Sequence, residues 1–175
     1  MIKKSAFTGD AVERLLAAND MSGEQLAGDL NISPQHSSNI KNNRRTMQAD
    51  IARESIDIYD HPAYSMDILY EFSGGLTSPV LRGKNIEQHR LAFSANAQRE
   101  IEEGLEKIKE VCLAKPPSSL DRDEKESVKS LMDELLDARI HTDNLLMQLQ
   151  LEYKISIKDR IKVLGPQWKA KGWLQ

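Results

Sequence analysis

The residues of this chain that could take part in recognition chemistry cluster in one short stretch, from Ser33 to Arg45. Their side chains are hydroxyls, amides, an imidazole and guanidiniums, and no Asp or Glu occurs between Asp29 and Asp50. Asn and Gln can pair with adenine through two hydrogen bonds, and Arg can pair with guanine or with phosphate. Because a surface without carboxylates favours a polyanion, the stretch predicts a site for double-stranded DNA. Its candidate residues are Ser33, Gln35, His36, Ser38, Asn39, Asn42, Asn43, Arg44 and Arg45.

Two roles are expected within this set, because its members lie on one predicted helix and on the turn after it. For His36 alone, an ordinary solvated side chain is the commoner interpretation, and the Asn-rich end is also consistent with a simple helix stop. In the DNA-binding interpretation, Gln35, His36 and Asn39 meet base edges, while Asn42, Arg44 and Arg45 contact phosphates.

Helix start signals position this stretch. Ser22 with Gln25 three residues later forms a capping box, so a helix begins there. Asn31 tolerates the left-handed conformation that a tight turn needs. Ser33 and Pro34 then start the next helix as its cap and its first residue. The sequence therefore predicts a helix-turn-helix from Ser22 to Arg45, in which Leu26, Ala27 and Leu30 are buried.

Three further helices complete the predicted first domain, residues 1–73. The first follows Thr8 or Asp10 as its cap and ends at Asn19. The fourth runs from a cap at Thr46 to about Ile58, and the fifth runs from 62 to 72. Their apolar spacing indicates buried faces at Val12, Leu15, Leu16, Ile51, Ser55, Ile58, Tyr64, Ile68, Leu69 and Phe72.

These helices and their motifs resemble a known family over residues 8–72. The matching segments are Gln25-Leu26-Ala27, Leu30-Asn31-Ile32-Ser33, Ile40 and the turn Asn43-Arg44-Arg45. They resemble the lambda-repressor-like (Cro/Xre) helix-turn-helix DNA-binding domain. The resemblance implies a transcriptional regulator, most often a repressor of the kind that phages and mobile elements carry.

The second half of the chain predicts a long antiparallel helical hairpin. A linker, residues 74–85, contains Gly and Pro, and the Pro-Pro turn at 115–119 separates helices of about 86–114 and 121–153. Asp121 with Glu124 marks the start of the second helix. The first helix has an apolar stripe that predicts a buried thiol at Cys112. A lone hairpin leaves apolar surface exposed, so we expect a homodimer through residues 86–153. The stripe consists of Phe93, Ala97, Ile101, Leu105, Ile108 and Cys112.

Beyond the hairpin lies a basic tail, which we assign with it to a second region, residues 86–175. A short helix is expected to end at Gly165-Pro166. Trp168 and Trp173 then stand among lysines, so they either anchor the tail in a groove or stack on nucleic acid, and an anchor is the commoner use. The fold class is thus all-α: a five-helix helix-turn-helix domain, a helical hairpin and a short helical tail.

Composition narrows the function classes. Charged residues are 29% and aromatic residues 5% of the 175 residues, as in a helical globular protein. There is no apolar run of membrane-spanning length and no signal peptide, so a cytoplasmic location without membrane contact is expected. One cysteine excludes an internal disulfide, and no catalytic, cofactor or metal motif is present. Asp137 and His141, four residues apart, suit a surface ion pair better than a metal site.

Charge keeps a second function open. Residues 1–82 have a balance of −3, residues 83–153 of −5 and residues 154–175 of +5, for a net charge of −3. A DNA-binding domain is often more basic. In the family that residues 8–72 resemble, a Gln that braces a phosphate often stands at the position of Gly23, and the position of Pro34 commonly reads a base. The alternative is therefore an inhibitor or adaptor that keeps the helix-turn-helix fold and binds a protein partner.

Overall fold

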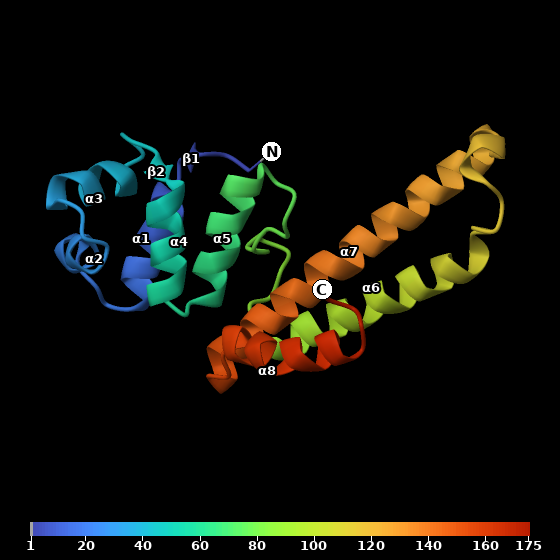
Figure 1. The fold of residues 1–175 in the computed structure, drawn as a ribbon. Coiled ribbons are helices and arrows are strands. Elements are labelled where there is room, and N and C mark those ends of the chain that lie inside the picture. The colour runs from blue at the N-terminus through green and yellow to red at the C-terminus, as the bar shows by residue number, and fades with distance from the viewer. Residues whose placement is uncertain (1) are drawn as a thin grey trace. The chain divides into compact units, whose positions relative to one another are not determined.

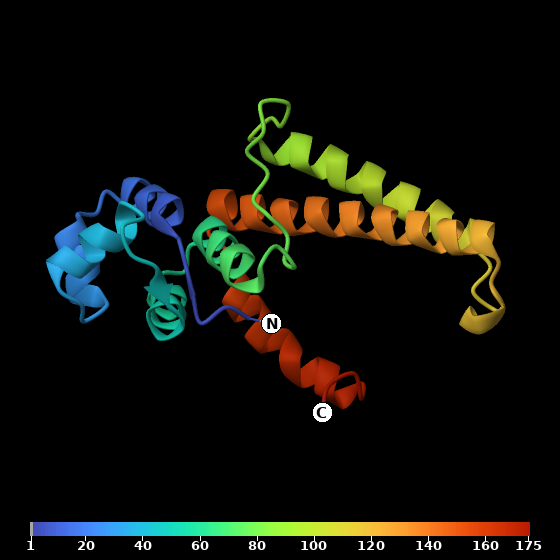
Figure 2. The same ribbon diagram turned by 90° about the horizontal axis from the view of Figure 1, so that it is seen from above.

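The computed structural model describes residues 2–175 and is mostly helical, which confirms the all-α class (Figures 1 and 2). The chain divides into two compact units. Unit 1 contains the residues up to Val80 together with Tyr153–Gln175, and unit 2 is Leu81–Glu152. In chain order the elements are β1 (Ser5–Ala6), α1 (Gly9–Ala18), α2 (Gly23–Asp29), α3 (Pro34–Lys41), β2 (Met47–Gln48), α4 (Ala49–Ile58), α5 (Pro62–Ser73), α6 (Arg90–Glu110), the 3-10 helix η1 (Pro117–Ser119), α7 (Arg122–Tyr153) and α8 (Ile157–Ala170).

Unit 1 is built on a core formed by α1 to α5. Helix α1 packs against α3 and α5, and α2 packs against α3. The predicted buried faces of α1 and α2 are confirmed, whereas on the later helices Ile58 is 46% and Leu69 is 50% exposed. The core residues are Ala6, Ala11, Val12, Leu15, Leu16, Leu26, Leu30, Ile40, Met47, Ala52, Tyr64, Ile68 and Phe72.

The predicted start of α2 is confirmed in atomic detail. The Gln25 backbone N–H donates to Ser22 Oγ at 3.1 Å, and the Ser22 N–H donates to Gln25 Oε1 at 2.7 Å. Asn31 adopts the left-handed conformation with φ of 54°. At α1 the prediction fails in part, because Thr8 is in the cap position but makes no side-chain cap bond.

Unit 1 also contains two short paired strands, which the sequence did not predict. Ser5 pairs with Gln48 and Ala6 with Met47 in an antiparallel arrangement. Met47 is 1% exposed, so β2 joins the core directly after the Ser33–Arg45 stretch. As a consequence α4 begins at Ala49 with Gln48 in its cap position, and Thr46 does not cap it.

Two tyrosines near α4 form side-chain hydrogen bonds, a buried one at Tyr64 and an exposed one at Tyr59. Tyr64 Oη donates to Ser55 Oγ at 2.8 Å, and Ser55 Oγ donates to the Ala52 carbonyl at 2.8 Å. Burial raises the pKa of Tyr64 to about 12. Tyr59 Oη donates to Asp29 Oδ2 at 2.6 Å, and burial, together with this bond, raises the pKa of Tyr59 above the usual phenol value.

The tail is grouped with unit 1, in which Lys158 Nζ donates to the carbonyls of Ile56 and Asp57 at the end of α4. Its helix, predicted to end at Gly165-Pro166, continues through Pro166 to Ala170, because a proline removes one backbone donor without forcing every helix to end. The side chain of Trp173 is 68% exposed and lies under Lys171 Nζ at 4.6 Å, so Trp173 is not an anchor.

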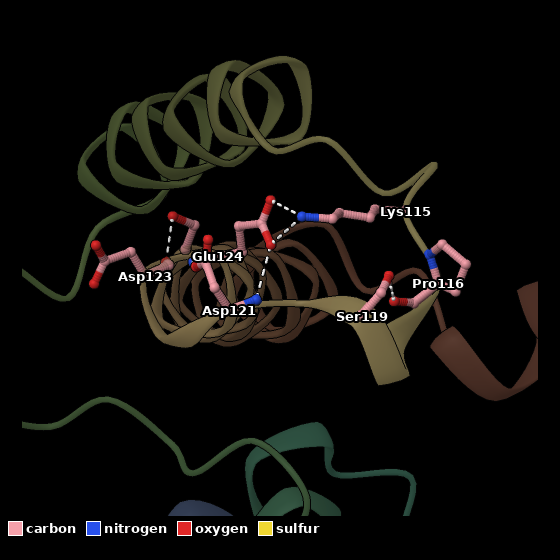
Figure 3. A network of polar contacts seen from close by, with 7 residues as sticks. Lys115, Pro116, Ser119, Asp121, Asp123 and Glu124 are labelled. Carbon is pink, nitrogen blue, oxygen red and sulfur yellow. Dashed lines mark hydrogen bonds and ion pairs between the residues drawn. The ribbon is translucent and has the colours of Figure 1, made fainter.

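Unit 2 contains the antiparallel pair of α6 and α7, which lie side by side in both views (Figures 1 and 2). Helix α6 is shorter than predicted. The predicted start of α7 is confirmed, because the Glu124 N–H donates to Asp121 Oδ1 and the Asp121 N–H donates to Glu124 Oε2, both at 2.9 Å. Lys115 Nζ reaches both Glu124 carboxylate oxygens at 2.8 Å across the turn (Figure 3). In the part of the chain described, no helix is long and apolar enough to cross a membrane.

The predicted apolar stripe of α6 is wrong for its second half. Phe93 and Ala97 are buried, but Ile101, Leu105 and Ile108 are 46–49% exposed. A step of four residues turns about 40° past a full helical turn, so a stripe with mostly four-residue steps drifts away from the neighbouring helix. Glu100 and Gly104 take the inner positions instead. Cys112 lies beyond the end of α6 and is exposed, so it is not the buried thiol that the stripe predicts.

Candidate nucleic-acid interface

Helix α3 is fixed to the rest of unit 1 by one side. Ile40 is 2% exposed in the core, and Ser37 is 1% exposed. The Ser37 hydroxyl donates to the Gly23 carbonyl at 3.0 Å, which ties α3 to the first residue of α2. The buried Ser37 hydroxyl is therefore satisfied by a hydrogen bond. The remaining face of α3 points away from these contacts.

The first turn of α3 uses part of the predicted site for its own structure. Ser33 Oγ accepts the His36 backbone N–H at 3.1 Å, so its side chain caps the helix. Gln35 Nε2 donates to Asn39 Oδ1 at 3.3 Å, one turn further along. Gln35 is exposed and Asn39 is half-buried, so this pair lies at the surface with donors and acceptors left over.

His36 is half-buried. Its Nε2 atom is shielded from solvent and has no hydrogen-bond partner among the described residues. A contact between this atom and a base would need a rotation of the ring. The structure therefore brings His36 to the predicted face without presenting Nε2 on it.

At the C-terminal end of α3, Asn42 closes the helix. Its Nδ2 donates to the Ser38 carbonyl at 2.8 Å and lies 3.4 Å from Ser38 Oγ. Both side chains are exposed. Their arrangement matches a helix stop and leaves Asn42 Oδ1 at the surface as an acceptor.

Asn43 has a structural contact that the sequence did not reveal. Its φ is 53°, and its Oδ1 accepts the Gly9 backbone N–H at 2.9 Å, while its Nδ2 lies 3.4 Å from Asp10 Oδ1. Asn43 thus caps α1, which Thr8 does not. Gly9 is required for this approach, because a Cβ there would lie 2.4 Å from the Lys41 carbonyl oxygen. The only signal in the sequence was an Asn at a helix end and a Gly at a helix start.

The turn after Asn43 presents two guanidiniums. The backbone N–H groups of Arg44 and Arg45 both donate to the Asn39 carbonyl, at 2.8 and 3.1 Å, so the backbone of the turn is held on α3. Both side chains are exposed, and neither forms an ion pair with any of residues 2–175. Their positive charge is therefore available to a ligand.

The other charged residues of unit 1 change its net charge. Unit 1 combines the basic tail with the acidic N-terminal part, so its net charge becomes +1, from 13 Lys and Arg against 12 Asp and Glu. The tail, however, is attached at the C-terminal end of α4, whereas the Ser33–Arg45 stretch leads into its N-terminal end through β2. The tail raises the net charge without adding cations beside α3.

A group of carboxylates in unit 2 has the ligand spacing of a metal site. Oxygens of Glu100, Glu103 and Glu134 lie within 4.8 Å of one another. Arg99 already binds this group, at 2.5 Å from Glu100 and 3.8 Å from Glu103, and that contact raises the pKa of Arg99. His141 lies 3.9 Å from Glu100. The group is an ion-pair cluster at the edge of the helix pair, in which Glu100 is buried, Glu134 half-buried and Glu103 exposed.

Comparison with protein-family models, with curated proteins and with solved structures finds no match for this chain.

Proposed function

We propose that this protein is a sequence-specific DNA-binding transcriptional regulator that acts as a dimer and represses by occupying its operator. The reading element would be the α2–α3 helix-turn-helix, with α3 in the major groove. The proposal is carried by one observation: α3 and its following turn expose amide and hydroxyl groups together with two unpaired guanidiniums, without a carboxylate between Asp29 and Asp50. The resemblance to lambda-repressor-like repressors of phages and mobile elements supports the same assignment.

Roles for the site residues follow from their contacts. Gln35 and Asn39 are suited to base edges, because their amides lie at the surface and retain free hydrogen-bonding positions. Arg44 and Arg45 are suited to phosphates, because the turn that carries them is held by the Asn39 carbonyl. Ser33 and Asn43 would act by shaping the site, because their side chains cap α3 and α1.

The test is selection from random duplex DNA, followed by binding measurements on the enriched sequence at several salt concentrations. Arg44→Ala should weaken binding to all sequences and reduce the salt slope by about one. Gln35→Ala should relax the preference at one base pair, at a cost of roughly 1–3 kcal/mol for that base. Arg53→Ala is the matched control, because Arg53 is an exposed guanidinium on α4.

Two outcomes would refute the proposal. One is binding that does not change with salt. The other is an Arg44→Ala effect no larger than that of Arg53→Ala.

The second candidate is a protein-interaction module with the same fold. It is favoured by the acidity of the residues up to Val80 and by Pro34, which is exposed at the first position of α3 and has no N–H to offer a phosphate. In that case no duplex sequence would be enriched. The wild type and Arg44→Ala would also behave alike toward any DNA.

A further inference from the structure

The α6–α7 hairpin has two chemically different faces, and the contact between the helices defines them. A Cβ at Gly104 would lie 3.7 Å from the Glu134 carbonyl oxygen and 3.9 Å from Ala138 Cβ, so Gly104 and Ala138 face each other. At about 100° per residue, Ile101, Leu105 and Ile108 lie to one side of Gly104, and Glu100 and Glu103 lie to the other.

The same division holds on α7. Met132, Leu135 and Leu146 lie to one side of Ala138, while Glu134 and His141 lie to the other. In an antiparallel pair, the same rotational direction on each helix points to the same face of the hairpin. The proximity of Glu134 to Glu100 and Glu103 agrees with this assignment. The apolar face is therefore Ile101, Leu105, Ile108, Met132, Leu135 and Leu146.

This apolar face is large enough for a specific contact. Its six side chains are each 43–58% exposed. Half-exposed side chains of this size offer on the order of 500 Å² for each protomer, at the upper end of the largest apolar patch on ordinary monomers. Two such faces would remove about 1,000 Å² of apolar surface, and their rims would bring the total to the range of a stable interface, roughly 1,200–2,000 Å².

The charge pattern favours a second copy of this chain as the occupant. Between Met132 and Leu146 the charged residues on this side of α7 are Arg139 and Asp143, and the Arg139 guanidinium lies 3.8 Å from the Asp143 carboxylate. The charges of Arg139 and Asp143 offset each other, so this side of α7 offers no net charge to a charged partner, whereas the same face on another copy matches it in polarity. Two copies related by a two-fold axis would meet through identical surfaces.

We propose that the apolar face of the hairpin binds the same face of a second copy to form a four-helix bundle. The inference rests on the dimer of the proposed function and names the surface that holds it. The acidic face with Glu100, Glu103 and Glu134 stays on the outside of this bundle. Gly104 and Ala138 keep α6 and α7 together within each protomer.

Two neighbouring leucines on α7 provide a matched test. Leu135 is 43% and Leu136 is 48% exposed, but Leu135 lies about 60° around α7 from Ala138, whereas Leu136 lies about 160° from it, nearly opposite the contact with α6. Sedimentation equilibrium of the full chain should give a dimer at micromolar concentration. Leu105→Glu and Leu135→Glu should each raise the dimer dissociation constant by at least about 100-fold, because a carboxylate would be buried against apolar side chains. Leu136→Glu should change it by less than about three-fold.

The controls separate this inference from loss of folding and from the proposed function. Far-UV circular dichroism should show unchanged helicity, and Ile108→Gln provides an uncharged variant should a carboxylate unfold the hairpin. A monomeric wild type, a dimer that persists in Leu105→Glu, or a Leu136→Glu protein as dissociated as Leu135→Glu would overturn the inference. A chain that dimerises as described but binds no DNA would refute the proposed function and leave this inference intact.

Discussion

Replacing Asn43 tests the contact that joins the candidate DNA-binding turn to the start of α1. Asn43 Oδ1 accepts the N–H of Gly9, the first residue of α1, whose backbone donor would otherwise have no partner in the helix. Loss of a cap of this kind costs about 1 kcal/mol. The φ of 53° at this position adds about 1 kcal/mol for alanine, which lacks the tolerance of Asn for the left-handed region.

Two variants separate these contributions. Asn43→Ala loses both the cap and the conformational tolerance, so we expect a fall of about 2 kcal/mol in the free energy of unfolding. Asn43→Gly loses the cap only, because glycine accepts a positive φ, so we expect about 1 kcal/mol. The glycine variant should therefore be more stable than the alanine variant, which is the reverse of the order expected in an exposed helix.

The assay is unfolding of the full chain by urea and by heat, with tryptophan fluorescence as the signal. Trp168 and Trp173 are the two tryptophans of the chain, and both lie in unit 1, so the signal reports on the unit that contains Asn43. For a unit of about 100 residues, 2 kcal/mol corresponds to a fall in melting temperature of about 10 °C. A glycine variant that is equal to or less stable than the alanine variant would refute the capping role and the strain assigned to this turn.

Three further predictions concern two glycines and the pH dependence of stability. Gly9→Ala should destabilise unit 1 by more than about 2 kcal/mol, because its Cβ would lie 2.4 Å from a backbone oxygen. Gly104→Ala should stabilise the hairpin by up to about 1 kcal/mol, because its Cβ would make ordinary contacts and alanine favours a helix. Chemical denaturation measures the stability of both glycine variants, and equal effects of the two substitutions would contradict both predictions. The hydrogen bond with Lys115 lowers the pKa of Glu124, and the bonds with Gln148 and Arg90 lower that of Glu152. A carboxyl group with a lowered pKa contributes stability that is present above its ordinary pKa of 4.5 and is lost as pH falls through its pKa in the folded protein. The melting temperature of the hairpin should therefore fall below about pH 4.5. Lys115→Met should weaken that dependence, and a melting temperature that stays constant down to acidic pH would contradict it.

Local signals in the sequence determined where several helices begin and which of their residues are buried. The capping box of Ser22 and Gln25 and the pair of Asp121 and Glu124 each join residues three positions apart. Such contacts need no other part of the chain. The buried residues of α1 and α2 were also predictable from the local sequence, because apolar residues at helical spacing lie on one face of the helix and that face packs on a single core.

Only the tertiary structure decided how these elements use the remaining residues. Asn43 and Gly9 are 34 positions apart, and the short β1–β2 pair joins segments about as distant, so neither contact leaves a local pattern. The rotation of α6 depended on its contact with α7. Gly104 lies in that contact, where an added Cβ would be 3.7 Å from the Glu134 carbonyl oxygen. The resulting rotation carried Ile101, Leu105 and Ile108 out of the interior and left an apolar face on the surface of the hairpin.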